Sequence, residues 1–166
     1  PTFKVIADLG MLNTYAGRLA VERATDAEIA EVRAAAQATI PGPGGDASVD
    51  DVADALIRFL TRFAEAAHDR LLAALTRFLV HLVVELEISS HERESDEFWR
   101  RWSASAGSLR LAMVERLEDR DAEKLAAAVT EYHDVVTERI KTIPALREAR
   151  LSDPALAAFL QRAVSR

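Results

Sequence analysis

The sequence predicts an all-α fold of about six to eight helices. Apolar residues recur at helical spacing along nearly the whole chain, and no segment shows the strict alternation typical of a half-buried strand. Residues that begin and end helices separate the apolar segments from one another. At 166 residues the chain has the length of one domain, so we expect a single domain over residues 1–166.

The first half of the chain is expected to form four helices. The first runs from about residue 2 to 23, and Thr25 with Glu28 fits the capping box that starts the second. The second must end at residues 41–45, where proline and glycine are concentrated and form either a plain loop or a mobile lid. Ser48 is expected to cap the third, which ends near residues 68–69, and the fourth reaches residues 89–90. The side chains expected to face inward are Phe3, Ile6, Leu9, Leu12, Ala16 and Leu19, then Ile29, Val32, Ala36 and Ile40, then Val52, Leu56, Phe59, Leu60 and Phe63, and finally Leu71, Leu75, Phe78, Leu82 and Leu86.

The second half is expected to form four more helices. The fifth begins with Phe98, Trp99 and Trp102 and is interrupted around residues 106–107, and the sixth spans about residues 108–118. Residues 119–121 offer caps for the seventh. Ser152-Asp153-Pro154 is a cap followed by proline at the first helical position, which predicts a short final helix. The inward residues of the seventh helix are Leu125, Ala128, Val129, Tyr132, Val136 and Ile140.

Composition excludes several classes of protein. The net charge is −6, and acidic and basic residues are interleaved. The chain therefore lacks the basic patch typical of a nucleic-acid-binding surface and is not expected to bind DNA alone. The absence of cysteine excludes disulfides, thiolate metal sites and cysteine catalysis. The longest strongly apolar stretch, residues 78–84, is far too short to span a bilayer, and no signal peptide is visible. We therefore expect a cytoplasmic protein without membrane contact.

Candidate catalytic and metal sites are weak. Glu65 and His68 form an E-x-x-H pattern, but a di-iron bundle needs a second copy and the chain has none. His81 and Glu85 could reach one metal ion, but the sequence places no further ligand with them, and an intrahelical hydrogen bond or charge pair explains their spacing better. No G-x-S-x-G elbow or phosphate-binding loop occurs. We therefore do not expect an enzyme.

Three local patterns carry a resemblance to a known family. They are RLAVERATDAEIAEVRAA at residues 18–35, RFAEAAHDRLL at residues 62–72 and ERLEDRDAEKLAAAVTEYH at residues 115–133. Their order and spacing resemble the FadR-type C-terminal domain, or FCD, of GntR-family transcription regulators, over most of residues 5–140. The resemblance implies an antiparallel helical bundle that senses a small-molecule effector and forms homodimers. It also implies that DNA is bound only through an attached N-terminal winged helix-turn-helix, which this sequence does not contain, so the chain is either a fragment of a longer regulator or a stand-alone sensor.

Many members of that family hold a divalent metal ion, and the resemblance places its ligands on this chain. An aspartate and a histidine would stand at Leu56 and Leu60, and a second histidine at Arg110. The last histidine would fall on Tyr132, or on His133 if the register slips by one. At most one ligand survives, and a single imidazole cannot hold a metal ion against water. We therefore expect no metal and no other cofactor.

This pattern of loss is similar to the metal-free branch of the family, in which an acyl-CoA occupies the same cavity. We expect an apolar cavity for a carboxylate or acyl-type effector, with Arg110 pairing bidentately to the acid and Tyr132 orienting it. In the alternative, Arg110 points to solvent and Tyr132 only fills the core. The predicted ligand-binding residues are Leu56, Leu60, Arg110, Tyr132 and His133.

Two functions are consistent with these patterns. The first is the effector-sensing and dimerisation domain of a bacterial GntR/FadR-type regulator, binding a small organic acid or acyl-type ligand without metal. The second is a helical dimerisation or interaction module with no small-molecule ligand, its pocket filled by its own side chains.

Overall fold

Seven α-helices make up most of the computed structural model, which describes residues 2–42, 45–90 and 94–143. Those ranges contain helices and their connections and no strand, as the sequence predicted. None of the helices in the described part of the chain combines the length and apolar character needed to cross a membrane. The final helix expected after Ser152 lies outside the described residues. The helices are α1 (Thr2–Arg23), α2 (Asp26–Ala38), α3 (Val49–Glu65), α4 (Arg70–Ser90), α5 (Asp96–Ala104), α6 (Gly107–Glu118) and α7 (Ala122–Lys141).

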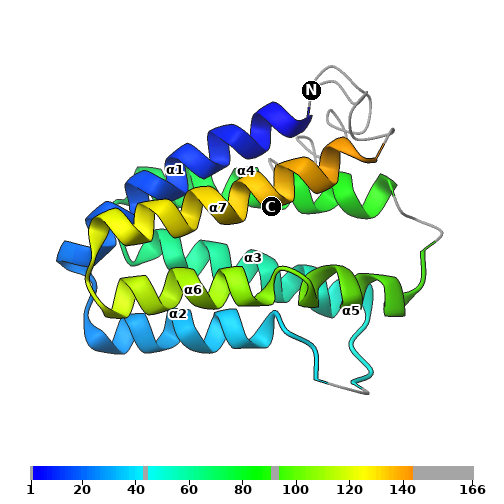
Figure 1. Ribbon diagram of the computed structural model, residues 1–166, viewed down its shortest axis with the longest axis horizontal. Helices are drawn as coiled ribbons and strands as arrows, with labels where there is room; N and C mark the ends of the chain where they lie inside the picture. The colour runs from blue at the N-terminus through cyan, green and yellow to red at the C-terminus, as the bar shows by residue number, and fades with distance from the viewer. Residues whose placement is uncertain (1, 43–44, 91–93, 144–166) are drawn as a thin grey trace.

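The helices pack as an elongated antiparallel bundle. Figure 1 shows α1 and α7 side by side and running in opposite directions, with α4 behind them. Below this pair, α5 and α6 follow one another across the front of α3, and α2 packs along α3 and α6. The main hydrophobic core fills the space between these layers and contains Phe59, Phe63, Met113 and Leu125, each fully buried. The chamber described below lies toward the end of the bundle where α5 sits.

The helix starts follow the capping residues that the sequence predicted. Thr25 and Glu28 form the full capping box of α2, with each side chain accepting from a backbone amide of the other. Ser48 forms the corresponding box with Asp51 at α3, and Asp121 caps α7. The break between α5 and α6 falls at residues 105–106, within one residue of the interruption predicted around residues 106–107.

The inward face predicted for α4 is wrong over the first half of the helix, whereas Leu82 is buried and Leu86 half-buried as predicted. Leu71 is 70% exposed, Leu75 is 44% exposed and Phe78 is 37% exposed. The buried face includes Thr76 and Glu87. Because α4 carries apolar residues on several faces, its periodicity alone did not determine its rotation. The apolar members of the buried face are Leu72, Val80, Leu82, Val83 and Val84.

In the family that the sequence resembles, the turn between α3 and α4 carries the pattern A-A-G-N, and the corresponding residues here are Ala66, Ala67, His68 and Asp69. His68 stands at the glycine position and adopts a left-handed conformation with a φ of 52°, which is costly for a residue with a Cβ. Its Nε2 lies 2.9 Å from a carboxylate oxygen of Glu28, so the imidazole gains a partner on α2. Asp69 replaces the asparagine and accepts a hydrogen bond from the backbone amide of Leu72 at 2.9 Å. The replacement therefore keeps the cap of α4.

Removing that cap should destabilise the fold measurably. We expect Asp69→Ala to lower the free energy of unfolding by about 1 kcal/mol, the usual effect of losing an N-cap side chain. Asp69→Asn retains an oxygen acceptor and should stay within about 0.5 kcal/mol of the parent protein. Urea unfolding followed by circular dichroism measures both values, and equal losses in the two variants would contradict a capping role.

Candidate functional site

A small chamber lies among α3, α4, α5, α6 and α7. Three of the residues predicted from sequence line it together: Leu56 from α3, Arg110 from α6 and Tyr132 from α7. Its free volume is about 40 Å³, room for a few water molecules. The wall is mostly apolar, with a few polar groups facing in. The other lining residues are Val49, Val52, Ala53, Val84, Glu87, Ile88, Trp99, Trp102, Ser103, Ala106, Val136 and Arg139.

Arg110 points inward and is 2% exposed, which excludes the solvent-facing alternative. Its Nε donates to the Thr39 hydroxyl at 2.7 Å, and its Nη2 donates to the backbone carbonyl oxygen of Ser103. The Ser103 hydroxyl in turn donates to the Thr39 carbonyl at 2.6 Å. A buried guanidinium requires such partners, because an unpaired buried charge is very costly. These bonds engage the Nε and Nη2 edge of the guanidinium, so a carboxylate cannot pair bidentately through that edge.

Tyr132 lies beside Arg110 within the chamber wall. The guanidinium carbon of Arg110 is 6.0 Å from the centroid of the Tyr132 ring, within range of a cation–π interaction. Burial raises the pKa of the Tyr132 phenol, while the positive charge of Arg110 acts in the opposite direction. The phenol therefore stays protonated near neutral pH and can donate a hydrogen bond to an acid.

The remaining two predicted residues lie next to the chamber rather than in its lining. Leu60 is 3% exposed and belongs to the main hydrophobic core. His133 faces α1, where its Nε2 lies 3.0 Å from the amide nitrogen of Asn13. Burial lowers the pKa of His133 to about 4, so the imidazole is neutral at physiological pH. Of these two adjacent residues, Tyr132 lines the chamber and His133 does not.

The sequence analysis missed the acidic group of the chamber. Glu87 is 5% exposed and accepts a hydrogen bond from the Trp102 indole at 3.3 Å. Burial raises the pKa of the Glu87 carboxyl to about 7, although the Trp102 hydrogen bond and the charge of Arg139 lower it. The signal available in the sequence was the segment Val83–Ile88, in which apolar residues surround Glu87 on a helix. The incorrect inward face of α4 hid that signal.

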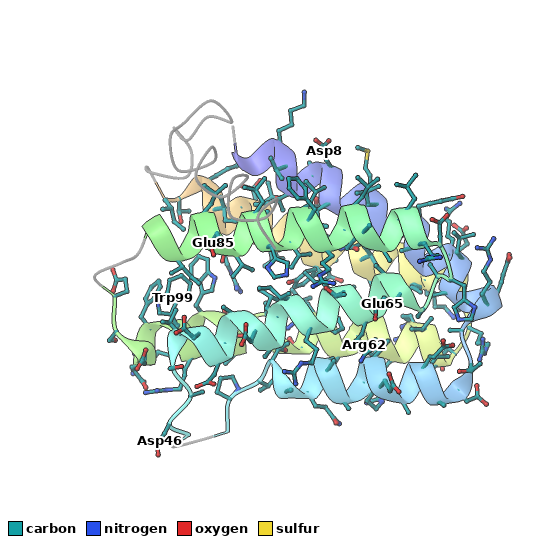
Figure 2. All side chains as sticks on the ribbon, turned by 180° about the vertical axis from the view of Figure 1, so that it is seen from behind. Asp8, Asp46, Arg62, Glu65, Glu85 and Trp99 are labelled. Carbon is teal, nitrogen blue, oxygen red and sulfur yellow. The ribbon has the colours of Figure 1, made fainter. Side chains whose placement is uncertain are left out.

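Arg139 is a second cation of the chamber that the sequence analysis missed. It is half-buried and donates to the Ser105 carbonyl at 3.1 Å. Its guanidinium carbon also lies 5.8 Å from the Trp102 ring centroid. Both tryptophans of the chain, Trp99 and Trp102, contribute to the lining, and Figure 2 shows Trp99 in the space between α3 and the C-terminal half of α4. The chamber thus combines two guanidinium groups, one carboxyl and an aromatic wall.

The E-x-x-H pattern forms surface contacts. Glu65 pairs with Arg62 on its own helix at 3.1 Å, and Figure 2 shows both on the outer part of α3 near α2. His68 pairs with Glu28 instead of sharing a site with Glu65. Nowhere in the described ranges do three histidine or acidic side chains gather as a metal ion would require.

Comparison with protein families shows that the FCD domain family matches residues 9–134, about three quarters of the chain. The chain belongs to the FCD domain family. FCD domains are the effector-binding domains of GntR-family transcription regulators, and such regulators are not enzymes. Comparison with curated proteins finds no significant match.

The residues of this FCD domain do not fit the metal ion of many family members. The positions that the resemblance assigns to its ligands hold Leu56, Leu60, Arg110 and Tyr132, and only the last carries an oxygen. The buried guanidinium of Arg110 repels a cation at the place where a ligating imidazole would stand.

The buried carboxyl should make stability depend on pH. The pKa of Glu87 is about 7 in the folded state against an ordinary 4.5, so the folded protein keeps a proton that the unfolded chain has lost. Stability therefore falls as pH rises from about 4.5 to 7 and stays reduced above that range. A neutral isostere avoids this loss, and we expect Glu87→Gln to exceed the parent protein by about 3 kcal/mol at pH 8 and by much less at pH 5.

Urea unfolding at pH 5 and pH 8 measures this difference. Glu85→Gln is the matched control, because Glu85 is an exposed carboxylate on the same helix. A gain in Glu87→Gln that is the same at both pH values would show that the carboxyl is not titrating in the folded protein.

Proposed function

We propose that this FCD domain senses a small organic acid, which it binds in the chamber without a metal ion. The observation that carries the proposal is the buried guanidinium of Arg110, which stands beside the Tyr132 hydroxyl and Leu56 in one partly enclosed space. Carboxylates are the usual partners of buried guanidinium groups in binding sites, and a neutral phenol adds a hydrogen-bond donor. Arg139 supplies a second positive charge at the same chamber.

The size of the chamber favours the smaller ligands. A free volume of about 40 Å³ suits a short carboxylate, whereas an acyl-type ligand requires side chains of the wall to move apart. Trp102, Leu56 and Val136 are only partly buried and belong to that wall, so they are the side chains most able to open it.

In the intact regulator we propose a homodimer in the cytoplasm that binds DNA only through attached winged helix-turn-helix domains. Tyr132 and Arg139 belong to α7, which packs along α1, and α1 is the helix that follows such a domain in the family. A ligand that biases α7 between two arrangements would change how α1 presents the two DNA-binding domains.

Two observations favour a second function. The polar partners of Arg110 come largely from the protein itself, and the free space in the chamber is small. Both features also fit a helical dimerisation or interaction module that binds no small molecule. Ligand titration separates the two functions.

Titration with small carboxylates tests the proposal. Both tryptophans line the chamber, so intrinsic fluorescence should respond when acetate, propionate or succinate binds. We expect Tyr132→Phe to weaken binding about fivefold through loss of one hydrogen bond, and Arg110→Gln to weaken it at least tenfold through loss of the charge. Arg116→Gln, on the exposed side of the same helix, is the control for Arg110 and should bind normally.

The outcomes are distinct. Saturable responses that Arg110→Gln and Tyr132→Phe weaken support an acid sensor. A parent protein that shows no saturable response to these acids or to an acyl-CoA supports the interaction module. Circular dichroism of each variant shows whether the bundle remains folded.

A further inference from the structure

Glu87 places a carboxyl group in a chamber that we propose to bind acids. It is the one acidic side chain among the described residues that line this space, and it is 5% exposed. The indole nitrogen of Trp102, a residue of α5, donates a hydrogen bond to Glu87 Oε2 at 3.3 Å. The two guanidinium groups bond mainly to neutral oxygens, Arg110 to Thr39 and Ser103 and Arg139 to Ser105. None of these bonds joins Glu87 to a guanidinium group, so the carboxyl is buried without a close ion pair among them.

An acid that enters this space brings a second carboxylate close to the first. The chamber is small, so the two carboxylates would lie within a few ångströms of one another. Two carboxylates held together away from water cannot both stay ionised, and such pairs share one proton. A proton on Glu87 removes the repulsion and turns the group into a hydrogen-bond donor for the ligand.

We infer that the chamber binds a short carboxylate together with one proton, which is held on Glu87. This inference rests on the proposed acid-sensing function and adds that Glu87 makes the affinity for the acid depend on pH. Glu87 acts as a specificity-determining residue that distinguishes acids from neutral molecules of the same shape. An acid binds together with the proton, whereas the neutral molecule would bind without it.

The groups that face Glu87 support this assignment. Tyr132 and Arg139 face it from α7, the Trp102 indole from α5 and the guanidinium of Arg110 lies across the chamber on α6. The lining residues of α3 are apolar. Burial raises the pKa of Glu87 to about 7 and raises that of Tyr132 above its ordinary value. Of these groups, Glu87 is the one that changes charge between pH 6 and 8.5, and a nearby anion raises its pKa further.

Acetate is the probe for the test. In the parent protein we expect acetate affinity, followed by tryptophan fluorescence, to be nearly constant below pH 6 and to fall about tenfold per pH unit above pH 7.5. Calorimetry in two buffers of different ionisation enthalpy should show uptake approaching one proton per acetate at pH 8. Glu87→Gln should bind acetate with the same affinity from pH 6 to 8.5 and take up no proton, whereas Glu85→Gln should behave as the parent protein. Acetamide should bind the parent protein without proton uptake.

The possible failures differ from one another. If acetate binds the parent protein at pH 8 without proton uptake, or if Glu87→Gln keeps the parent pH profile, the proton linkage is wrong and the acid sensor stands. If acetate, propionate and succinate bind neither protein at any pH, the proposed function fails and the linkage fails with it. The proton count of the parent protein decides the inference even if Glu87→Gln does not fold.

Discussion

The buried guanidinium of Arg110 is the constraint on which the chamber depends. Its bonds to Thr39 and Ser103 join the end of α2, the end of α5 and the start of α6 at one point. They engage a hydroxyl at the end of α2 and a carbonyl at the end of α5. Because a buried charge is tolerated only when it is well bonded, these three segments must stay together for the fold to hold. The same charge disfavours a metal cation in the chamber, and the acid that we propose as the ligand would pair with it.

Local signals in the sequence sufficed for the helix boundaries and for most of the core. Thr25, Ser48 and Asp121 act at helix starts through contacts within three residues, and such contacts can be read from a short window. Leu56, Arg110 and Tyr132 were brought together by the family resemblance, and the structure does place them around one space. The chemistry of two of these three side chains, a buried cation and a buried phenol, could therefore be anticipated before the fold was known.

The rest of the chamber depends on information that the sequence does not express locally. Arg110 and its partner Thr39 are 71 residues apart, and no periodic pattern connects them. The rotation of α4 was ambiguous because its apolar residues cover several faces, and an error of about one residue turned Glu87 away from the core. Tyr132 and His133 are adjacent, and neighbours on an α-helix point about 100° apart, so only one could face the chamber. Packing against α1 decides which of the two faces the chamber, because His133 contacts Asn13 on α1 and Tyr132 is left facing the chamber.

That contact also bears on how the chamber could communicate with the outside of the bundle. His133 lies against Gly10 so closely that an added Cβ at Gly10 would come within 3.1 Å of the histidine side chain. Tyr132, one residue earlier on α7, belongs to the chamber wall. A closely packed interface of this kind shifts between discrete arrangements and does not deform gradually. A ligand that displaces Tyr132 must therefore either move α1 together with α7 or break the hydrogen bond between His133 and Asn13. Moving the two helices together preserves the packing between them.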